Sequence, residues 1–147
     1  MPQRQELLKL EDVFRLVLKK LSYTWKKNVD SDISRTQFLI LDRLFSEGPQ
    51  KVSDLAEALH ITCGAVTGNC DKLIKSGLST RTRDEQDRRV VFMEITSQGQ
   101  KIMEEVKKQR NRIIECLFKD FTEEDRENLT RLFSHMLTNL EEIDSKE

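Results

Sequence analysis

Residues 52–77 read VSDLAEALHITCGAVTGNCDKLIKSG, and this stretch decides the fold. Apolar residues recur at helical spacing at Val52, Leu55, Ala56 and Leu59. They predict a short helix that Ser53 caps, followed by a turn at His60-Ile61. Thr62 then caps a second helix that continues to about residue 76, with Gly77 just beyond its end. Two short helices joined by a tight turn are typical of a helix-turn-helix.

The residues that follow predict a β-hairpin. Residues 79–84 are polar and basic, and residues 90–95 are rich in β-favouring side chains, with a polar connection at 85–89. A helix-turn-helix followed by a hairpin has the element order of a winged helix-turn-helix. In that motif the second helix enters the DNA major groove, and a basic hairpin, the wing, reaches the backbone or the neighbouring minor groove.

The segments before this motif predict two more helices. Apolar residues recur every three or four positions from Leu7 to Leu21, so a long amphipathic first helix should reach about Lys27. Ser34 and Gln37 occupy the positions of a capping box, which predicts a second helix that runs to about Phe45.

Two long helices are expected after the hairpin. Ser97 and Gln100 form a second capping box for a helix that ends near Asp120, and Thr122 caps the last helix. Apolar positions 129, 132, 136, 140 and 143 have the spacing of a helix-pairing seam. The expected fold is mainly α with a small β-hairpin. A winged helix-turn-helix at 34–96 joins a helical dimerisation region at 1–33 and 97–147, in one intertwined subunit.

Composition and motifs exclude several classes of protein. The 147 residues are 37% hydrophobic and 35% charged, with 25 Lys and Arg against 26 Asp and Glu, which fits one folded domain. No apolar run approaches the ~18 to 20 residues of a membrane span, so we expect a cytoplasmic protein with no membrane partner. The three cysteines and two histidines fit no metal site, and no cofactor is expected. No phosphate loop, nucleophile elbow or zinc-protease motif occurs, so we expect no catalytic site and no enzyme.

The second helix of the motif has a face suited to DNA. Opposite its apolar stripe of Cys63, Val66, Cys70 and Leu73 it carries small residues and polar groups that let the backbone approach DNA closely. The candidate contacts are Thr62, Gly64, Ala65, Thr67, Gly68, Asn69, Lys72 and Lys75. The lysines suit phosphates, and Asn69 suits a base edge, adenine by preference. The alternative is a solvated face on a core helix. Each interior glycine costs about 0.8 to 1.0 kcal/mol relative to alanine, so a purely structural helix has little reason to keep both Gly64 and Gly68.

The hairpin concentrates basic residues. They are Arg81, Arg83, Arg88 and Arg89. The interleaved Asp84, Glu85 and Asp87 can hold the guanidinium groups in fixed directions, and a narrow A·T-rich minor groove attracts inserted arginine. The alternative is a surface loop whose mixed charges neutralise one another.

Six segments between Ser34 and Lys101 have an order and spacing that are specific as a set. They are Phe38-Leu39-Ile40-Leu41, Val52-Ser53-Asp54-Leu55-Ala56, Ala65-Val66-Thr67, Leu73-Ile74-Lys75-Ser76-Gly77-Leu78, Arg83-Asp84-Glu85-Gln86-Asp87-Arg88-Arg89 and Ile95-Thr96-Ser97-Gln98-Gly99. As a set they resemble the MarR family of bacterial transcription regulators.

The resemblance implies roles for particular residues. Arg89 is expected at the minor groove, and Asp87 is expected to orient its basic neighbours. The family also implies a homodimer in which the first, fifth and sixth helices of each subunit interlock. Gly68 departs from the family pattern, because many members carry a bulky or basic residue there. Asn69, Lys72 and the wing therefore carry more of the expected readout.

The expected function is a homodimeric, DNA-binding transcriptional regulator. The resemblance implies a repressor, the most frequent role in the family, that leaves its operator on a small-molecule or other chemical signal. A two-fold dimer should bind a pseudo-palindromic operator with half-sites about 10 to 10.5 base pairs apart. The expected partners are double-stranded DNA, a second copy of the chain and a small-molecule effector. The alternative is a winged-helix module that contacts an acidic protein and binds no DNA.

Aromatic residues and cysteines leave further alternatives open. Four aromatic residues are candidates for an effector pocket, as in the family, or for the core: Tyr23, Trp25, Phe38 and Phe45. Cys63 and Cys70 share the apolar stripe, which favours two small core residues. Cys116 is open to a role as a thiol sensor or to a place in the dimer interface.

Overall fold

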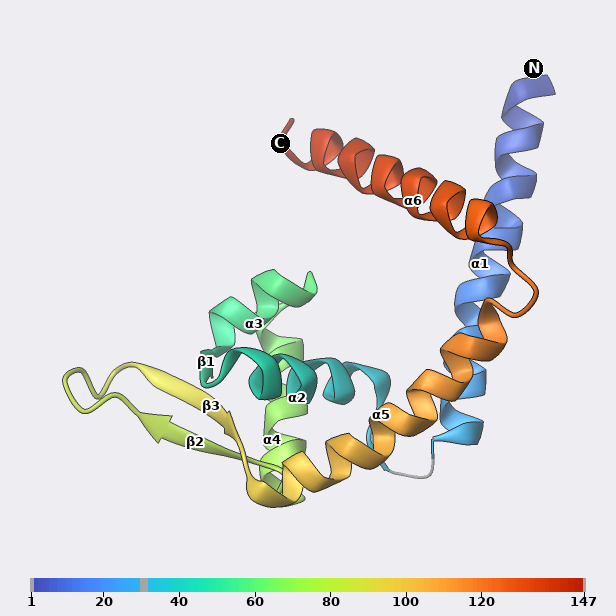
Figure 1. Ribbon diagram of the computed structural model, residues 1–147. Coiled ribbons are helices and arrows are strands. Elements are labelled where there is room, and N and C mark those ends of the chain that lie inside the picture. Colours follow the sequence, from blue (N-terminus) through green and yellow to red (C-terminus); the bar gives the residue numbers. More distant parts are fainter. Residues whose placement is uncertain (1, 30–31, 147) are drawn as a thin grey trace. The chain divides into compact units, whose positions relative to one another are not determined.

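The computed structural model describes residues 2–29 and 32–146 (Figure 1). Its helices and strands follow in the order α1 (Pro2–Asn28), α2 (Arg35–Glu47), β1 (Gln50–Lys51), α3 (Val52–Leu59), α4 (Cys63–Lys75), β2 (Ser79–Arg83), β3 (Val91–Ile95), α5 (Ser97–Leu117) and α6 (Glu123–Asp144). This order confirms the predicted fold class, a mainly helical chain with a winged helix-turn-helix. The chain forms two compact units, Met1–Asn111 and Arg112–Glu147, and α5 crosses their boundary.

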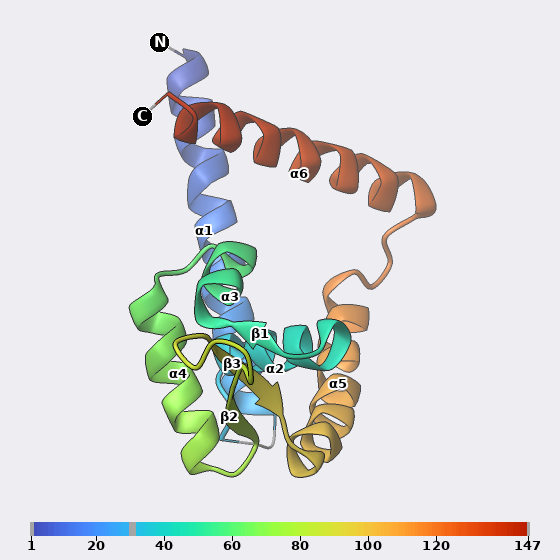
Figure 2. The same ribbon diagram turned by 90° about the vertical axis from the view of Figure 1, so that its left-hand side faces the viewer.

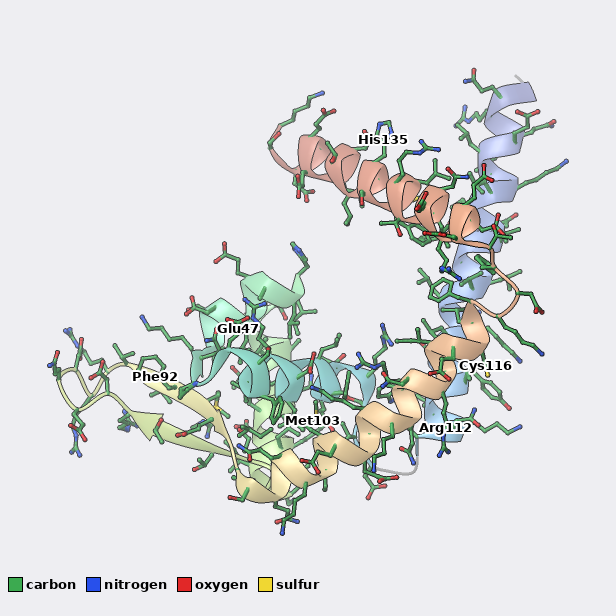
Figure 3. All side chains as sticks on the ribbon, viewed as in Figure 1. Glu47, Phe92, Met103, Arg112, Cys116 and His135 are labelled. Carbon is green, nitrogen blue, oxygen red and sulfur yellow. The ribbon has the colours of Figure 1, made fainter. Side chains whose placement is uncertain are left out.

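The first unit holds the core of the winged helix-turn-helix. Fully buried aliphatic side chains join α2, α3 and α4: Ile40, Leu41, Leu44, Leu55, Val66 and Leu73. Met103 and Val106 of α5 are buried as well, and Figure 3 labels Met103 on that helix. Burial of one such side chain contributes roughly 1.5 to 3 kcal/mol, so this core fixes where α4 lies. Figure 2 shows α4, α3 and the hairpin of β2 and β3 in the same part of the molecule.

A three-stranded antiparallel sheet connects the hairpin to the helices. Its order is β1-β3-β2, and Met93 of the central strand pairs with Gln50 on one side and Arg81 on the other. The two-residue strand β1 was not predicted from the sequence, because it is too short to show an alternation of apolar and polar residues. Its pairing holds Lys51 extended, so α3 begins at Val52 with Lys51 as its N-cap and no side-chain cap bond. The predicted cap at Ser53 is therefore wrong.

The helix ends follow local hydrogen bonds. The capping box of Ser34 and Gln37 is present, and so is the cap of Thr122. For α5 the predicted cap at Ser97 is wrong, because Thr96 Oγ1 accepts from Gly99 N at 3.0 Å and Ser97 is already helical. α5 also ends at Leu117, earlier than the predicted Asp120.

The exposed apolar side chains of the described residues are most numerous on α1 and α6. On α1 these are Leu7, Leu8, Leu10, Val13, Phe14, Leu16, Val17 and Leu18. On α6 they are Leu132, Phe133, Met136, Leu137, Leu140 and Ile143, and α6 has no buried residue. Among the described residues, no helix is long and apolar enough to cross a membrane.

Candidate nucleic-acid interface

A tight turn places α4 after α3. His60 adopts the left-handed conformation, with φ of 54°, and caps the C-terminus of α3, as expected for a residue that shapes this turn. Thr62 then starts α4, because its Oγ1 accepts from Ala65 N at 3.1 Å. This cap was predicted from the sequence, and the hydrogen bond fixes which residue begins α4.

The two faces of α4 separate as helical spacing predicts, with one exception. Val66, Cys70 and Leu73 are buried. The exposed residues are Thr62, Gly64, Ala65, Thr67, Gly68, Lys72 and Lys75. Cys63 is exposed too, so its predicted place in the core is wrong. As the first residue of α4, it lies one turn before Val66, where the buried stripe begins.

Asn69 lies between these two faces. It is half-buried, and its Nδ2 donates to Ala65 O at 2.8 Å within α4. Its Oδ1 accepts from Nε2 of Gln37, a buried residue of α2, at 3.4 Å. The Asn69 side-chain amide, predicted from the sequence to recognise a base, thus forms its hydrogen bonds inside the protein.

At the tip of the wing, Asp87 holds Arg89. Asp87 Oδ1 accepts from Nε and from the backbone N of Arg89, both at 3.1 Å, while the Arg89 side chain is 91% exposed. Hydrogen bonds from the Arg89 side chain and backbone lower the pKa of the Asp87 carboxyl group. The carboxylate therefore stays charged through the pH range near 4 where ordinary carboxyl groups take up a proton. The ion pair is lost only as the pH falls through the lowered pKa. The guanidinium is aimed outward at neutral pH.

Other bonds brace the wing internally. Arg83 Nη1 donates to Arg88 O at 2.8 Å, and Gln86 N donates to Asp84 Oδ1 at 2.9 Å. The Arg88 side chain is exposed. On β2, Arg81 pairs with Asp71 of α4, which links the wing to that helix. Arg81, Arg83, Arg88, Arg89 and Asp87 thus lie on one hairpin, where the side chains of Arg81, Arg83 and Arg89 each have a partner in the protein.

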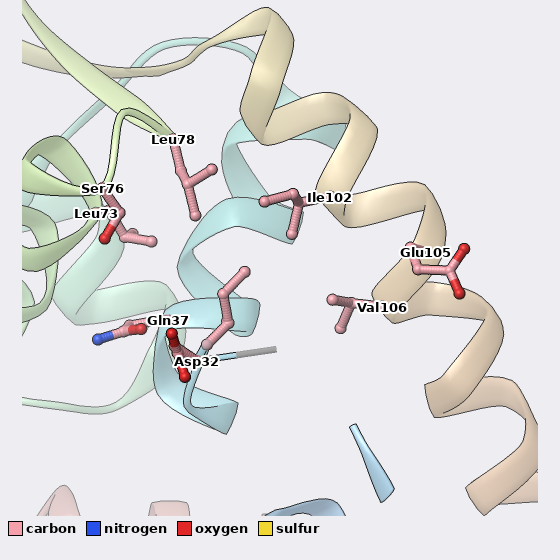
Figure 4. Close-up of a pocket in the computed structure, with 9 residues that line it drawn as sticks. Asp32, Gln37, Leu73, Ser76, Leu78, Ile102, Glu105 and Val106 are labelled. Atoms are coloured by element: carbon pink, nitrogen blue, oxygen red, sulfur yellow. The ribbon is translucent and has the colours of Figure 1, made fainter. Parts of the chain in front are cut away.

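A cavity of about 280 Å³ opens beside α4. Figure 4 shows Leu73 of α4 and its C-cap Ser76, Gln37 of α2, and Ile102 and Val106 of α5 along its wall, with Glu105 pointing away. The wall is mainly apolar, which suits a small organic molecule. The described residues that line the cavity belong to the first unit.

The four aromatic candidates for an effector pocket have other surroundings. Trp25 and Phe38 are 2% exposed each, and their ring centroids lie 5.1 Å apart. Tyr23 and Phe45 are exposed, and Lys107 Nζ lies 4.6 Å from the Phe45 centroid. None of the four lines the cavity described above.

Comparison with known proteins identifies the family of the chain. The sequence model of the MarR family matches residues 33–91. The HTH-type transcriptional repressor MdtR of Bacillus subtilis is 30% identical over 118 residues, which cover 80% of this chain and 74% of MdtR. The chain belongs to the MarR family. It is therefore a helix-turn-helix transcriptional regulator.

Two further comparisons agree with this assignment. The uncharacterized HTH-type transcriptional regulator YpoP of Bacillus subtilis is 28% identical over 132 residues, which cover 90% of this chain and 94% of YpoP. The crystal structure of a mutant of MarR from E. coli, complexed with operator DNA, has a TM-score of 0.81 at 23% identity, covering 90% of this chain and 96% of that one. This structure shows that the fold is shared. The MarR match at 33–91 contains all the α4 and wing residues discussed above.

The cysteines of this MarR-family chain should differ in reactivity. Burial raises the pKa of the Cys70 thiol to about 11, whereas Cys63 is exposed. At pH 8 a thiol with such a pKa is about one-thousandth thiolate, the nucleophilic form. In a Cys116→Ser variant, Ellman's reagent should therefore modify one thiol at once and the second only after unfolding. Simultaneous reaction of both thiols in the folded protein would show that Cys70 is accessible.

Proposed function

We propose that the chain acts as a homodimeric repressor that binds a pseudo-palindromic operator and leaves it when a small molecule binds. The observation that carries the proposal is the exposed α4 face of small and polar side chains next to a wing whose Asp87 aims Arg89 outward. Small side chains let a helix enter the major groove closely, and an exposed arginine suits the minor groove.

On DNA, each proposed residue has a distinct role. Thr67 and Gly68 bring the α4 backbone toward the bases, and Lys72 and Lys75 neutralise phosphates. The residues proposed for the remaining contacts are Thr62, Gly64, Ala65, Arg81, Arg83, Arg88 and Arg89, with Asp87 and Asn69 in support. Arg89 enters the adjacent minor groove.

The exposed apolar faces of α1 and α6 support the homodimer. Soluble monomers rarely expose contiguous apolar patches of more than a few hundred Å², and such patches mark interaction sites. In a two-fold dimer the same patch serves both subunits, and the two copies of α4 then reach successive major grooves. The operator half-sites should lie about 10 to 10.5 base pairs apart.

The cavity beside α4 is the proposed place of an effector. A molecule bound there would touch Leu73 at the end of α4, the C-cap residue Ser76, and Ile102 and Val106 of α5. Its binding would change operator affinity only by the difference between its affinities for the DNA-bound and DNA-free conformations. The pocket of Tyr23, Trp25, Phe38 and Phe45 stays a prediction, to be compared with the cavity by substitution.

Selection of duplexes tests the proposal. The purified protein is mixed with fragmented genomic DNA at physiological salt, and the bound fragments are sequenced. The result expected is an enriched two-fold motif with half-sites one helical turn apart. A Thr67→Glu, Gly68→Glu variant is the negative control, because both positions are exposed and a Cβ added at Gly68 meets no described atom within 4 Å beyond its chain neighbours and the backbone of its own helix. No enrichment by the unmodified protein would favour a protein-binding module.

The ion pair of Asp71 and Arg81 predicts a variant that binds more tightly. Asp71 competes with DNA phosphates for the Arg81 guanidinium, and it carries a negative charge on α4 itself. Because an exposed ion pair contributes about 0.2 to 1 kcal/mol, Asp71→Asn should strengthen operator binding up to about fivefold. Fluorescence anisotropy at fixed salt measures the change, with Asp54→Asn on α3 as the charge-matched control. Weaker binding by Asp71→Asn would show that the pair positions the wing instead.

A further inference from the structure

Gln37 of α2 bonds in two directions at once. Its Oε1 accepts from Ser34 N at 3.3 Å, and its backbone N donates to Ser34 Oγ at 3.1 Å, which together form the capping box of α2. Its Nε2 donates to Asn69 Oδ1 of α4 at 3.4 Å. Gln37 is only 8% exposed, and it lines the cavity beside α4.

The capping box and the bond to Asn69 orient the Gln37 amide together. Because Oε1 is used for the cap of α2, Nε2 is the group left to face α4. Asn69 is oriented in the same way, since its Nδ2 donates to Ala65 O and leaves Oδ1 as the acceptor. The two amides therefore form a directed chain from Ser34, at the start of α2, to Ala65 of α4.

This chain of hydrogen bonds supplies directionality, which the apolar core beside it lacks. Val66, Cys70 and Leu73 hold α4 through burial, and burial is non-directional, whereas hydrogen bonds depend on angle. A small rotation of α4 about its axis costs apolar contacts little, but it breaks the bond between Gln37 and Asn69. Such a rotation would also move Thr67 and Gly68, which belong to the exposed face of α4.

We propose that Gln37 is a positioning residue that sets the rotation of α4 through Asn69 and thereby determines operator specificity. The proposal rests on the proposed function, in which α4 reads the operator. Asn69 then acts on DNA through the orientation of its helix, while its amide stays bonded to α2. The orientation of α4 determines which of its side chains face the bases in the major groove.

A matched pair of variants separates this role from the capping role. Gln37→Glu keeps an oxygen for Ser34 N but removes the donor toward Asn69, and glutamate suits this position of a capping box. Ser34→Ala removes the side-chain acceptor of the cap and leaves both amides of the bridge in place. The variant Asn69→Ala and the double variant Gln37→Glu, Asn69→Ala complete a double-mutant cycle.

The main readout is the ratio of affinities for the selected operator and for a scrambled duplex, at one salt concentration and at a temperature where every variant is folded. A general loss of stability does not change this ratio. Gln37→Glu and Asn69→Ala should each lower it about tenfold, which is what the loss of one net hydrogen bond allows. The double variant should lower it no further, and Ser34→Ala should stay within about twofold of the unmodified protein.

Two results would overturn the proposal. Equal losses for Ser34→Ala and Gln37→Glu would mean that Gln37 acts only through the cap, and multiplying losses in the double variant would mean that Gln37 and Asn69 act separately. A second readout needs no DNA: amide hydrogen exchange at residues 66–70 should be faster in Gln37→Glu than in Ser34→Ala. If the unmodified protein shows no sequence preference, the proposed function fails, and hydrogen exchange still decides whether Gln37 holds α4.

Discussion

Replacing Leu137 and Leu140 by glutamate should make the protein monomeric and lower its affinity for the selected operator at least about 100-fold. The two side chains are 62% and 56% exposed in the single chain, so the change removes no core contact within the subunit. In the proposed dimer they are buried against the partner, where unpaired carboxylates are costly. A monomer binds one half-site, and loss of the second binding module lowers overall affinity by about 10² to 10⁴.

Sedimentation velocity measures the first effect, and anisotropy with the full operator measures the second. Ser134→Glu with Thr138→Glu is the matched control, because helical spacing places both positions away from the apolar seam of α6 and both are exposed. The control should remain dimeric and bind normally. A dimeric Leu137→Glu, Leu140→Glu variant would place the dimer interface elsewhere on the chain.

Arg89→Ala should weaken operator binding by about 1 to 3 kcal/mol and leave the dimer intact. The Arg89 guanidinium is 91% exposed and held by Asp87, so its removal costs no folded contact beyond that pair. The bonds that brace the loop, from Arg83 to the Arg88 carbonyl and from Gln86 to Asp84, remain. The loss should therefore fall on DNA binding alone.

Titration of a labelled operator at fixed salt gives the size of this loss. Arg43→Ala on α2 is the control, since it removes the same charge from an exposed position outside the proposed interface. Sedimentation of both variants tests the dimer. An Arg89→Ala variant with unchanged affinity would remove the wing from the interface and leave α4 as the proposed contact.

Much of the fold was predictable because its signals are local. Thr62 and Ser34 cap helices through bonds to residues three positions ahead, and such pairs can be read directly from sequence. The hairpin followed from β-favouring residues beside a polar connection. The order of these elements then identified the winged helix-turn-helix before any tertiary contact was known.

The errors arose where tertiary contacts determine the local structure. Lys51 is extended because β1 pairs with β3, so α3 begins directly after it, at Val52, and Ser53 lies inside the helix. Thr96 is placed by its bond to Gly77 O at 2.7 Å, across 19 residues of sequence, and it takes the role expected of Ser97. Neither pairing leaves a periodic signal in the sequence.

The candidate site was predictable to a similar extent. Helical spacing separated the buried and exposed faces of α4, but it placed Cys63 in the core although the buried stripe begins only at Val66. The spacing also could not show that the Asn69 amide faces α2, because its partner Gln37 lies 32 residues earlier in the sequence. Periodicity assigns a residue to a face, whereas the direction of a side chain depends on its neighbours in space.

The most direct test is to measure the affinity of the unmodified protein for its selected operator and for a scrambled duplex over a series of salt concentrations. Log K should fall linearly with log salt, with a slope of about −0.9 for each phosphate neutralised. At physiological salt the operator should bind at least ~10³-fold more tightly than the scrambled duplex. Equal affinity for the two duplexes at every salt concentration would contradict sequence-specific binding by α4 and the wing.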